Sequence, residues 1–149
     1  METTDNKNKI LSIALDLFSS KGYDAVGVQA LCEKSGITKP TLYYHFGNKE
    51  GVLKEVLKAN YEKLNDLLDK NAHYTPNAKV YEKDVILTLT TVAQAYLKFA
   101  KANPKFYKIV LNATFAPDCG SLNIIAKDLN NVQFQIIEKM FKSMARIHR

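Results

Sequence analysis

Cysteine is scarce in this chain of 149 residues, which contains only Cys32 and Cys119. Two cysteines so far apart do not provide the framework of a small disulfide-stabilised domain. Because residues 1–9 are largely polar, we expect no secretory signal, and the sequence contains no apolar run long enough to span a bilayer. We therefore expect a cytoplasmic protein whose hydrophobic core is large enough to stabilise it without covalent cross-links.

Side chains suited to catalysis are not grouped in any known motif. The sequence contains no pairing of nucleophile and base, no glycine-rich phosphate loop and no cluster of metal ligands. His45, for example, has no second ligand at a useful spacing. The sequence therefore predicts that the protein is not an enzyme and that it uses no metal ion and no cofactor.

The alternation typical of strands is missing too, whereas apolar residues recur at intervals of three and four, which is typical of helices. This pattern predicts an all-α chain. Gly51 should weaken the first turn of its helix by about 0.5–1 kcal/mol relative to a better helix former. We expect disorder over 1–8, loops over 72–79 and 116–120, and helices over about 7–20, from 28, from 39 or 40 to 46, about 49–71, 86–102, from 104, and 122–147.

The segment 28–46 organises the chain, because it is predicted to form two short helices joined by a tight turn. Gly36 can adopt the left-handed backbone that closes a helix, and Thr38 can cap the helix that follows. Leu42 and Phe46, four residues apart, give this second helix an apolar back. Its front resembles the recognition helix of a helix-turn-helix, with long or hydrogen-bonding side chains: Lys39, Thr41, Tyr43, Tyr44 and His45.

The order of residues in this region is specific beyond the general motif. The sequence GITKPTLYYHFGNKE at 36–50, with ALDLF at 14–18 and KGYDA at 21–25, resembles the DNA-binding signature of the TetR family of transcriptional regulators. The resemblance covers roughly the first third of the chain. It implies a three-helix helix-turn-helix DNA-binding domain over 7–52, followed by a helical ligand-binding and dimerisation domain over 53–149.

The resemblance implies a repressor that binds a double-stranded DNA operator and is released by a small effector. An activator of the same family is an alternative, and so is a truncated helical module that no longer binds DNA specifically. Lysine and threonine at the start of a recognition helix can reach base edges, whereas tyrosine and histidine can donate to phosphates. The residues predicted to contact DNA are Gln29, Thr38, Lys39, Thr41, Tyr43, Tyr44, His45 and Lys49.

Net charge does not by itself identify the DNA-binding part, although the whole chain carries +6. Residues 1–60 contain eight lysines and seven acidic residues, whereas residues 61–149 contain thirteen basic and eight acidic residues. The only arginines, Arg146 and Arg149, lie at the end of the sequence. Bidentate readout of guanine by arginine is therefore not available in the recognition helix.

The second region supplies candidates for ligand binding and self-association. The resemblance implies that an apolar or amphipathic effector binds among its aromatic residues, each of which could equally be a core residue: Tyr96, Phe99, Phe106, Tyr107 and Phe115. The chain is shorter than typical members of the family, so it is either naturally short or truncated. Its last helix has a broad apolar face, on which we expect a homodimer interface formed by Val132, Ile136, Met140, Phe141 and Met144.

Overall fold

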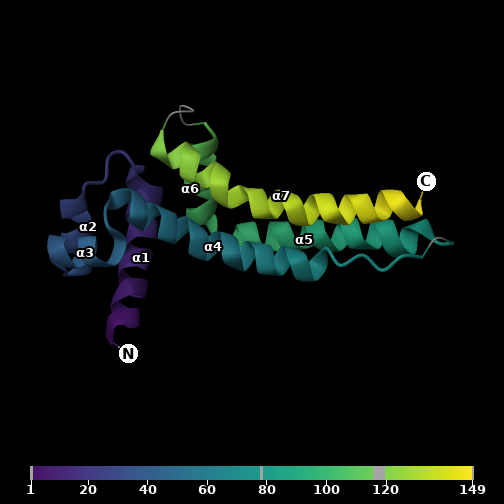
Figure 1. The fold of residues 1–149 in the computed structure, drawn as a ribbon, viewed down its shortest axis with the longest axis horizontal. Coiled ribbons are helices and arrows are strands. Elements are labelled where there is room, and N and C mark those ends of the chain that lie inside the picture. Colours follow the sequence, from purple (N-terminus) through teal and green to yellow (C-terminus); the bar gives the residue numbers. More distant parts are fainter. Residues whose placement is uncertain (1, 78, 116–119, 149) are drawn as a thin grey trace. The chain divides into compact units, whose positions relative to one another are not determined.

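The computed structural model describes residues 2–77, 79–115 and 120–148, with side chains from residue 6 onward (Figure 1). Helices are the only regular elements in these residues, as the sequence predicted. In chain order they are α1 (Glu2–Lys21), α2 (Val28–Ser35), α3 (Lys39–Phe46), α4 (Lys49–Asn71), the π-helical turn η1 (Glu82–Ile86), α5 (Leu87–Ala102), α6 (Pro104–Thr114) and α7 (Ser121–Ile147).

The predicted helix boundaries are confirmed within a few residues, except at the amino terminus. Helix α1 begins at Glu2, so the predicted disorder over 1–8 is wrong for the described residues. No glycine or proline interrupts this stretch, and each added residue extends an existing helix at little cost. Lys7 is also tied down, because its Nζ lies 2.6 Å from Glu55 Oε2 and 5.9 Å from the ring centroid of Phe46. The predicted loop over 116–120 lies outside the described residues except for Gly120.

The turn between α2 and α3 has the predicted local chemistry. Gly36 adopts a left-handed conformation, with φ 68° and ψ 33°, and its N–H donates to the carbonyl of Glu33. Thr38 Oγ1 caps α3 by accepting from the N–H of Thr41 at 3.4 Å. Behind the turn, Leu42 is fully buried. The position of α3 is therefore set by a cap at its start and by its apolar back.

Gly51 has a different role from the one that helix propensity suggests. The Oδ1 of Asn48 caps α4 by accepting from the N–H of Gly51 at 2.8 Å. A Cβ on Gly51 would lie 1.8 Å from the carbonyl oxygen of Phe46, so any side chain would force the α3–α4 connection to shift. The expectation that a better helix former would be more favourable here is therefore wrong, because the close approach of the backbone requires glycine.

The chain divides into two compact units. The first consists of Met1–Asn60 and Pro104–Leu129, and the second consists of Tyr61–Asn103 and Asn130–Arg149. Helices α4 and α7 each contribute residues to both units. The functional division at residue 52, which the family resemblance implies, stays a prediction.

In the first unit, α1 packs against both α2 and α6. Its core consists of large apolar side chains that are almost completely buried: Ile10, Phe18, Val26, Leu31, Leu42, Val52, Leu53, Leu57, Phe106 and Ile109. A polar contact on the surface joins α1 and α6, since Lys105 Nζ lies 2.6 Å from Asp16 Oδ1, and another joins α7 and α4, where Ser121 donates to Glu50. Helix α6 thus packs against α1, the helix that also contacts α2.

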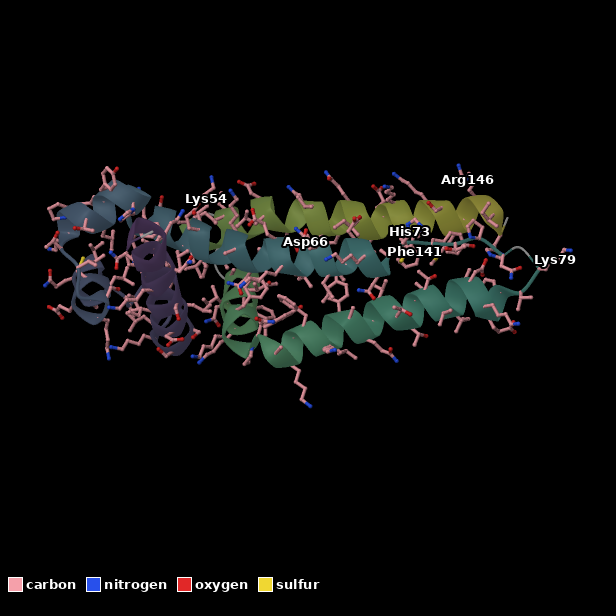
Figure 2. All side chains as sticks on the ribbon, turned by 90° about the horizontal axis from the view of Figure 1, so that it is seen from below. Lys54, Asp66, His73, Lys79, Phe141 and Arg146 are labelled. Atoms are coloured by element: carbon pink, nitrogen blue, oxygen red, sulfur yellow. The ribbon has the colours of Figure 1, made fainter. Side chains whose placement is uncertain are left out.

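In the second unit, buried residues of α4, α5 and α7 form the core, among them Leu64, Leu68, Val92, Met140 and Met144. The outer faces of these helices carry charged side chains. Asp66 on α4 and Arg146 on α7, for example, are exposed (Figure 2).

Candidate nucleic-acid interface and ligand cavity

One face of α3 is exposed to solvent, and the opposite face is buried in the core. Leu42 and Phe46 are buried, whereas Lys39 is exposed and the side chains of Tyr43 and Tyr44 are 46% and 85% exposed. Neither tyrosine is therefore a core residue. Thr41 and His45 are half-buried at the edges of this face. The face presents an ammonium group and two phenol hydroxyls, all of which can donate hydrogen bonds to phosphate or base acceptors.

Thr38 and Thr41 form a polar pair at the start of α3. Their hydroxyl oxygens lie 2.9 Å apart, and Thr38 Oγ1 also accepts from the backbone of Thr41. Thr38 thus caps the helix, while the half-buried Thr41 has its hydroxyl within hydrogen-bond distance of the Thr38 hydroxyl. This arrangement fixes the first turn of α3, which is the part of a recognition helix that reaches base edges.

Gln29 on α2 is exposed, but its side chain already has a partner. Its Nε2 donates to Glu33 Oε1 at 2.8 Å, one helical turn further along. The prediction from sequence did not include Glu33, although its spacing of four residues from Gln29 could have suggested the pair. A carboxylate at this position repels phosphate, so Glu33 limits how closely α2 can approach a nucleic-acid backbone.

Lys49 is also engaged within the chain. Its Nζ donates to the carbonyl of Tyr23 at 3.1 Å and lies 4.2 Å from the centroid of the Tyr23 ring. Burial of Tyr23, together with the nearby carboxylates of Glu50 and Asp24, raises the pKa of this phenol to about 12. Lys49 is half-buried and its charge is held at the amino terminus of α4, so binding a phosphate there would compete with its contacts to Tyr23.

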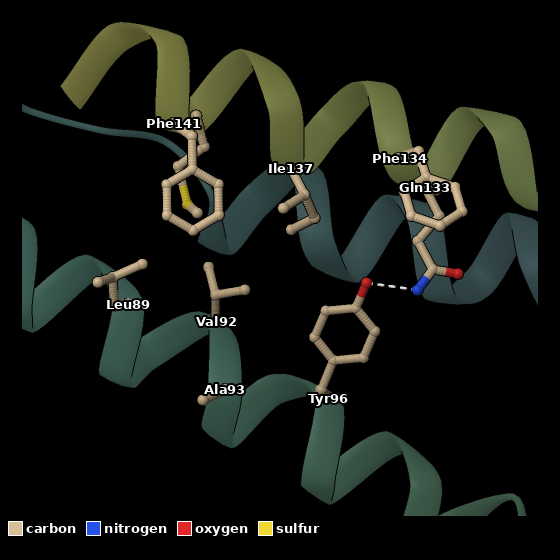
Figure 3. Close-up of a pocket in the computed structure, with 9 residues that line it drawn as sticks. Leu89, Val92, Ala93, Tyr96, Gln133, Phe134, Ile137 and Phe141 are labelled. Carbon is tan, nitrogen blue, oxygen red and sulfur yellow. Dashed lines mark hydrogen bonds between the residues drawn. The ribbon is translucent and has the colours of Figure 1, made fainter. Parts of the chain in front are cut away.

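The second unit contains an apolar cavity of about 310 Å³ between α5 and α7 (Figure 3). No charged side chain lines it. Its polar groups are Tyr96 and Gln133, whose Nε2 donates to the Tyr96 hydroxyl oxygen. Burial raises the pKa of Tyr96, although the hydrogen bond from Gln133 acts in the opposite direction. The lining residues are Leu89, Val92, Ala93 and Tyr96 of α5, with Gln133, Phe134, Ile137, Met140 and Phe141 of α7.

Of the five aromatic residues predicted to bind a ligand, Tyr96 alone lines this cavity. Phe106 is buried in the first unit, where its ring meets that of Tyr107 edge to face at 5.5 Å. Phe115, also in the first unit, is 85% exposed. Phe99 lies on α5 outside the cavity lining, so the structure does not bring the five residues together.

The predicted interface residues on α7 divide between the interior and the surface. Met140 and Met144 are buried in the second unit, so they do not form a surface, and that part of the prediction is wrong. Ile136 is half-buried, whereas Val132 and Phe141 remain about half exposed. The reason is that α7 is apolar on more than one side, and one of these sides packs within its own unit.

A second cavity of about 290 Å³ shares one lining residue, Met140, with the first. This cavity is polar, and its lining includes Asp69, Lys139 and Tyr74. Met140 is only 3% exposed. Charged side chains therefore line the second cavity but not the first.

A buried carboxylate organises the part of the second unit in which η1 meets His148, just beyond α7. Asp84 in η1 accepts hydrogen bonds from the Tyr74 hydroxyl at 2.8 Å, the Asn77 N–H at 2.7 Å and the Val85 N–H at 2.5 Å, and its Oδ2 lies 2.8 Å from His148 Nε2. Burial alone would raise the pKa of Asp84, but these hydrogen bonds outweigh it and lower the pKa below its usual range. Burial and the bond to Asp84 raise the pKa of Tyr74 to about 12.

Sequence reasoning missed this Asp84 cluster, because His148 lies 64 positions from Asp84 and no motif links the members that are nearer in the chain. Among the residues with described side chains, no group of three or more histidine, cysteine, aspartate and glutamate residues could hold a metal ion. The described part of the chain also contains no helix with the length and apolar character needed to cross a membrane.

Comparison with known proteins connects the first unit to a family. Residues 10–56 match the family described as "Bacterial regulatory proteins, tetR family". Over 65 residues the chain is 35% identical to the "Biofilm operon icaADBC HTH-type negative transcriptional regulator IcaR" of Staphylococcus aureus (strain Newman). That alignment covers 44% of this chain and 35% of the relative. The chain thus matches about a third of the length of this curated relative.

Solved structures share the fold over a longer part of the chain. The fatty acid degradation regulator FadR from Bacillus halodurans superimposes with a TM-score of 0.71 at 16% identity, over 91% of this chain and 69% of that one. The TetR family transcriptional regulator PfmR from Thermus thermophilus gives 0.67 at 22% identity, over 94% and 73%. At these identities the likeness concerns the fold.

Proposed function

We propose that this chain is a regulator of the TetR type, whose family model matches residues 10–56, and that it is a sequence-specific DNA-binding transcriptional repressor released by a small effector. The observation that carries the proposal is the exposed polar face of α3, anchored by Leu42 and Phe46 within the segment that matches the family. The relative from Staphylococcus aureus is named a negative transcriptional regulator, which favours repression over activation.

In the proposed mechanism, the first turn of α3 enters the major groove of operator DNA. Lys39 bonds guanine O6 or N7, and the Thr41 methyl group contacts a thymine methyl group. Gln29, Tyr43, Tyr44, His45 and Lys49 contact phosphates, and Thr38 holds the helix in position through its cap. One helix-turn-helix makes few contacts, so two copies would bind half-sites about 34–36 Å apart.

The protein would therefore act as a homodimer in the cytoplasm, with a DNA-binding domain over 7–52 and an effector and dimerisation domain over 53–149. Exposed apolar residues of α7, including Val132, are the candidates for contact between copies, since Met140 and Met144 are buried. An effector in the α5–α7 cavity would alter α7, which contributes residues to both units. Binding that favours one arrangement of the protein would lower the population of the DNA-binding arrangement.

Operator selection from random DNA tests this function. We expect a two-fold symmetric sequence to be enriched, and Lys39→Ala to relax specificity at one position in each half-site at a cost of about 1–3 kcal/mol there. Tyr43→Ala should weaken binding to all sequences alike. Lys108→Ala, a change at an exposed lysine of α6, is the control and should leave affinity nearly unchanged.

If no sequence is enriched, the chain is better described as a helical interaction module. If a sequence is enriched but deleting the gene lowers expression from the adjacent promoter, the protein is an activator. Equal, uniform losses for Lys39→Ala and Tyr43→Ala would show that Lys39 does not read a base.

A further inference from the structure

The cavity between α5 and α7 has a chemical character that restricts what can bind in it. We propose that it takes an uncharged, mostly apolar molecule carrying one hydrogen-bond acceptor, such as a ketone, ester or alcohol of medium size, and that it rejects carboxylates. The role of this molecule as an effector rests on the proposed function, whereas its binding does not.

Exclusion of charged ligands follows from the lining. Seven of its nine residues are apolar, and Tyr96 and Gln133 are neutral. A carboxylate placed there would lose its hydration without gaining a cationic partner, which is strongly unfavourable. Lys139 lines the second cavity and is not among the residues that line the apolar one. A ligand head group inside the apolar cavity therefore meets no compensating charge.

The acceptor requirement follows from the Tyr96–Gln133 pair (Figure 3). Gln133 donates to the hydroxyl oxygen of Tyr96, so the hydroxyl hydrogen of Tyr96 remains available to donate. The raised pKa of Tyr96 keeps this hydroxyl protonated at neutral pH. A carbonyl, ether or hydroxyl oxygen on the ligand would accept this bond, which fixes one end of an otherwise apolar molecule.

The size and the walls of the cavity indicate how affinity would arise. A volume of about 310 Å³ is at the small end of ligand sites and suits a single medium chain or a small ring system. Phe134 and Phe141 line it, yet they are 67% and 51% exposed. A bound apolar molecule would cover part of both rings, and removal of that surface from water favours binding.

Calorimetric titration with two matched probes tests the proposal on the full chain. 2-Octanone and octanoate have the same number of carbon atoms, but near neutral pH only octanoate is charged. We expect 2-octanone to bind at least about tenfold more tightly. Octanoate should gain affinity as the pH falls toward the pKa of the free acid.

Two variants assign the binding to this cavity. Tyr96→Phe should weaken 2-octanone binding by about fivefold, the effect of one hydrogen bond, and Ala93→Phe should abolish binding by filling the space. Matched changes outside the lining, Tyr81→Phe and Ala102→Phe, should leave the affinity unchanged, and circular dichroism should show every variant folded.

The proposal is overturned if neither probe binds, if octanoate binds as tightly as 2-octanone, or if Tyr96→Phe has no effect on the ketone. Retained binding in a folded Ala93→Phe variant would place the ligand elsewhere and would also overturn it. DNA binding by the same preparations is measured separately. If the protein does not bind DNA but still binds the ketone, the proposed function fails while this inference holds.

Discussion

The eight-residue helix α3 depends on tertiary packing for its existence, and Leu42→Ala tests this dependence. Isolated helices shorter than about 12–15 residues are marginal in water. Leu42 is fully buried at the centre of α3, and its truncation in a well-packed core should cost about 2–5 kcal/mol. A domain is stabilised by about 5–15 kcal/mol in total, so this single change should remove a large part of the stability of the first unit.

The neighbouring Tyr43→Ala change should affect DNA binding rather than stability. Tyr43 is 46% exposed, so its truncation should change stability by no more than about 0.5 kcal/mol while weakening DNA binding. Urea titration followed by circular dichroism measures the stability, and fluorescence anisotropy with the selected operator measures the affinity. Leu111→Ala, at a 55% exposed position of α6, is the matched control and should alter neither quantity much.

The reasoning is refuted if Leu42→Ala is as stable as the unmodified chain, because α3 would then not rely on its apolar back. A loss of several kcal/mol for Tyr43→Ala would likewise show that this tyrosine is structural. Loss of DNA binding by Leu42→Ala under conditions where it is fully folded would show that position 42 acts on DNA in some further way.

Three further predictions concern the charged and apolar groups described above. Since hydrogen bonds lower the pKa of Asp84, its carboxylate stabilises the second unit above about pH 4, and this contribution is lost as the pH falls below that value. Asp84→Asn should therefore reduce the loss of unfolding free energy at acid pH, and an unchanged loss would contradict this role of Asp84. Met140→Glu should unfold the second unit, whereas Val132→Glu should leave it folded and reduce self-association in light scattering; a folded, monomeric Met140→Glu variant would reverse that conclusion. Lys49→Ala should reduce the slope of log affinity against log salt by about one unit, and an equal slope would mean that Lys49 serves only its contacts with Tyr23.

The features that sequence predicted well are those determined by neighbouring residues. The left-handed Gly36 and the Thr38 cap each involve atoms within a few positions of one another. Because such local chemistry has few solutions, the helix-turn-helix and the limits of α3 could be inferred from the order of residues alone. The apolar spacing likewise identified the long helices α4 and α7.

The features that sequence could not predict depend on which distant surfaces meet. Helix α7 is apolar on several sides. Its sequence alone does not show that Met140 is buried whereas Phe141 is half exposed at the cavity. Gly51 was misread because the obstructing atom belongs to Phe46, outside its own helix. The DNA contacts predicted at Lys39, Tyr43 and their neighbours stay predictions.

The Asp84 cluster has a consequence for the end of α7. The last turn of a helix usually frays, because its final carbonyls lack partners within the helix. Here His148, just beyond α7, is bonded to a carboxylate 64 positions earlier in the chain. Opening this turn therefore also disrupts a buried polar network, so its amide hydrogens should exchange with deuterium nearly as slowly as those in the middle of the helix. The end of α7 and the turn η1 would then open together, as one cooperative event rather than as two independent fluctuations.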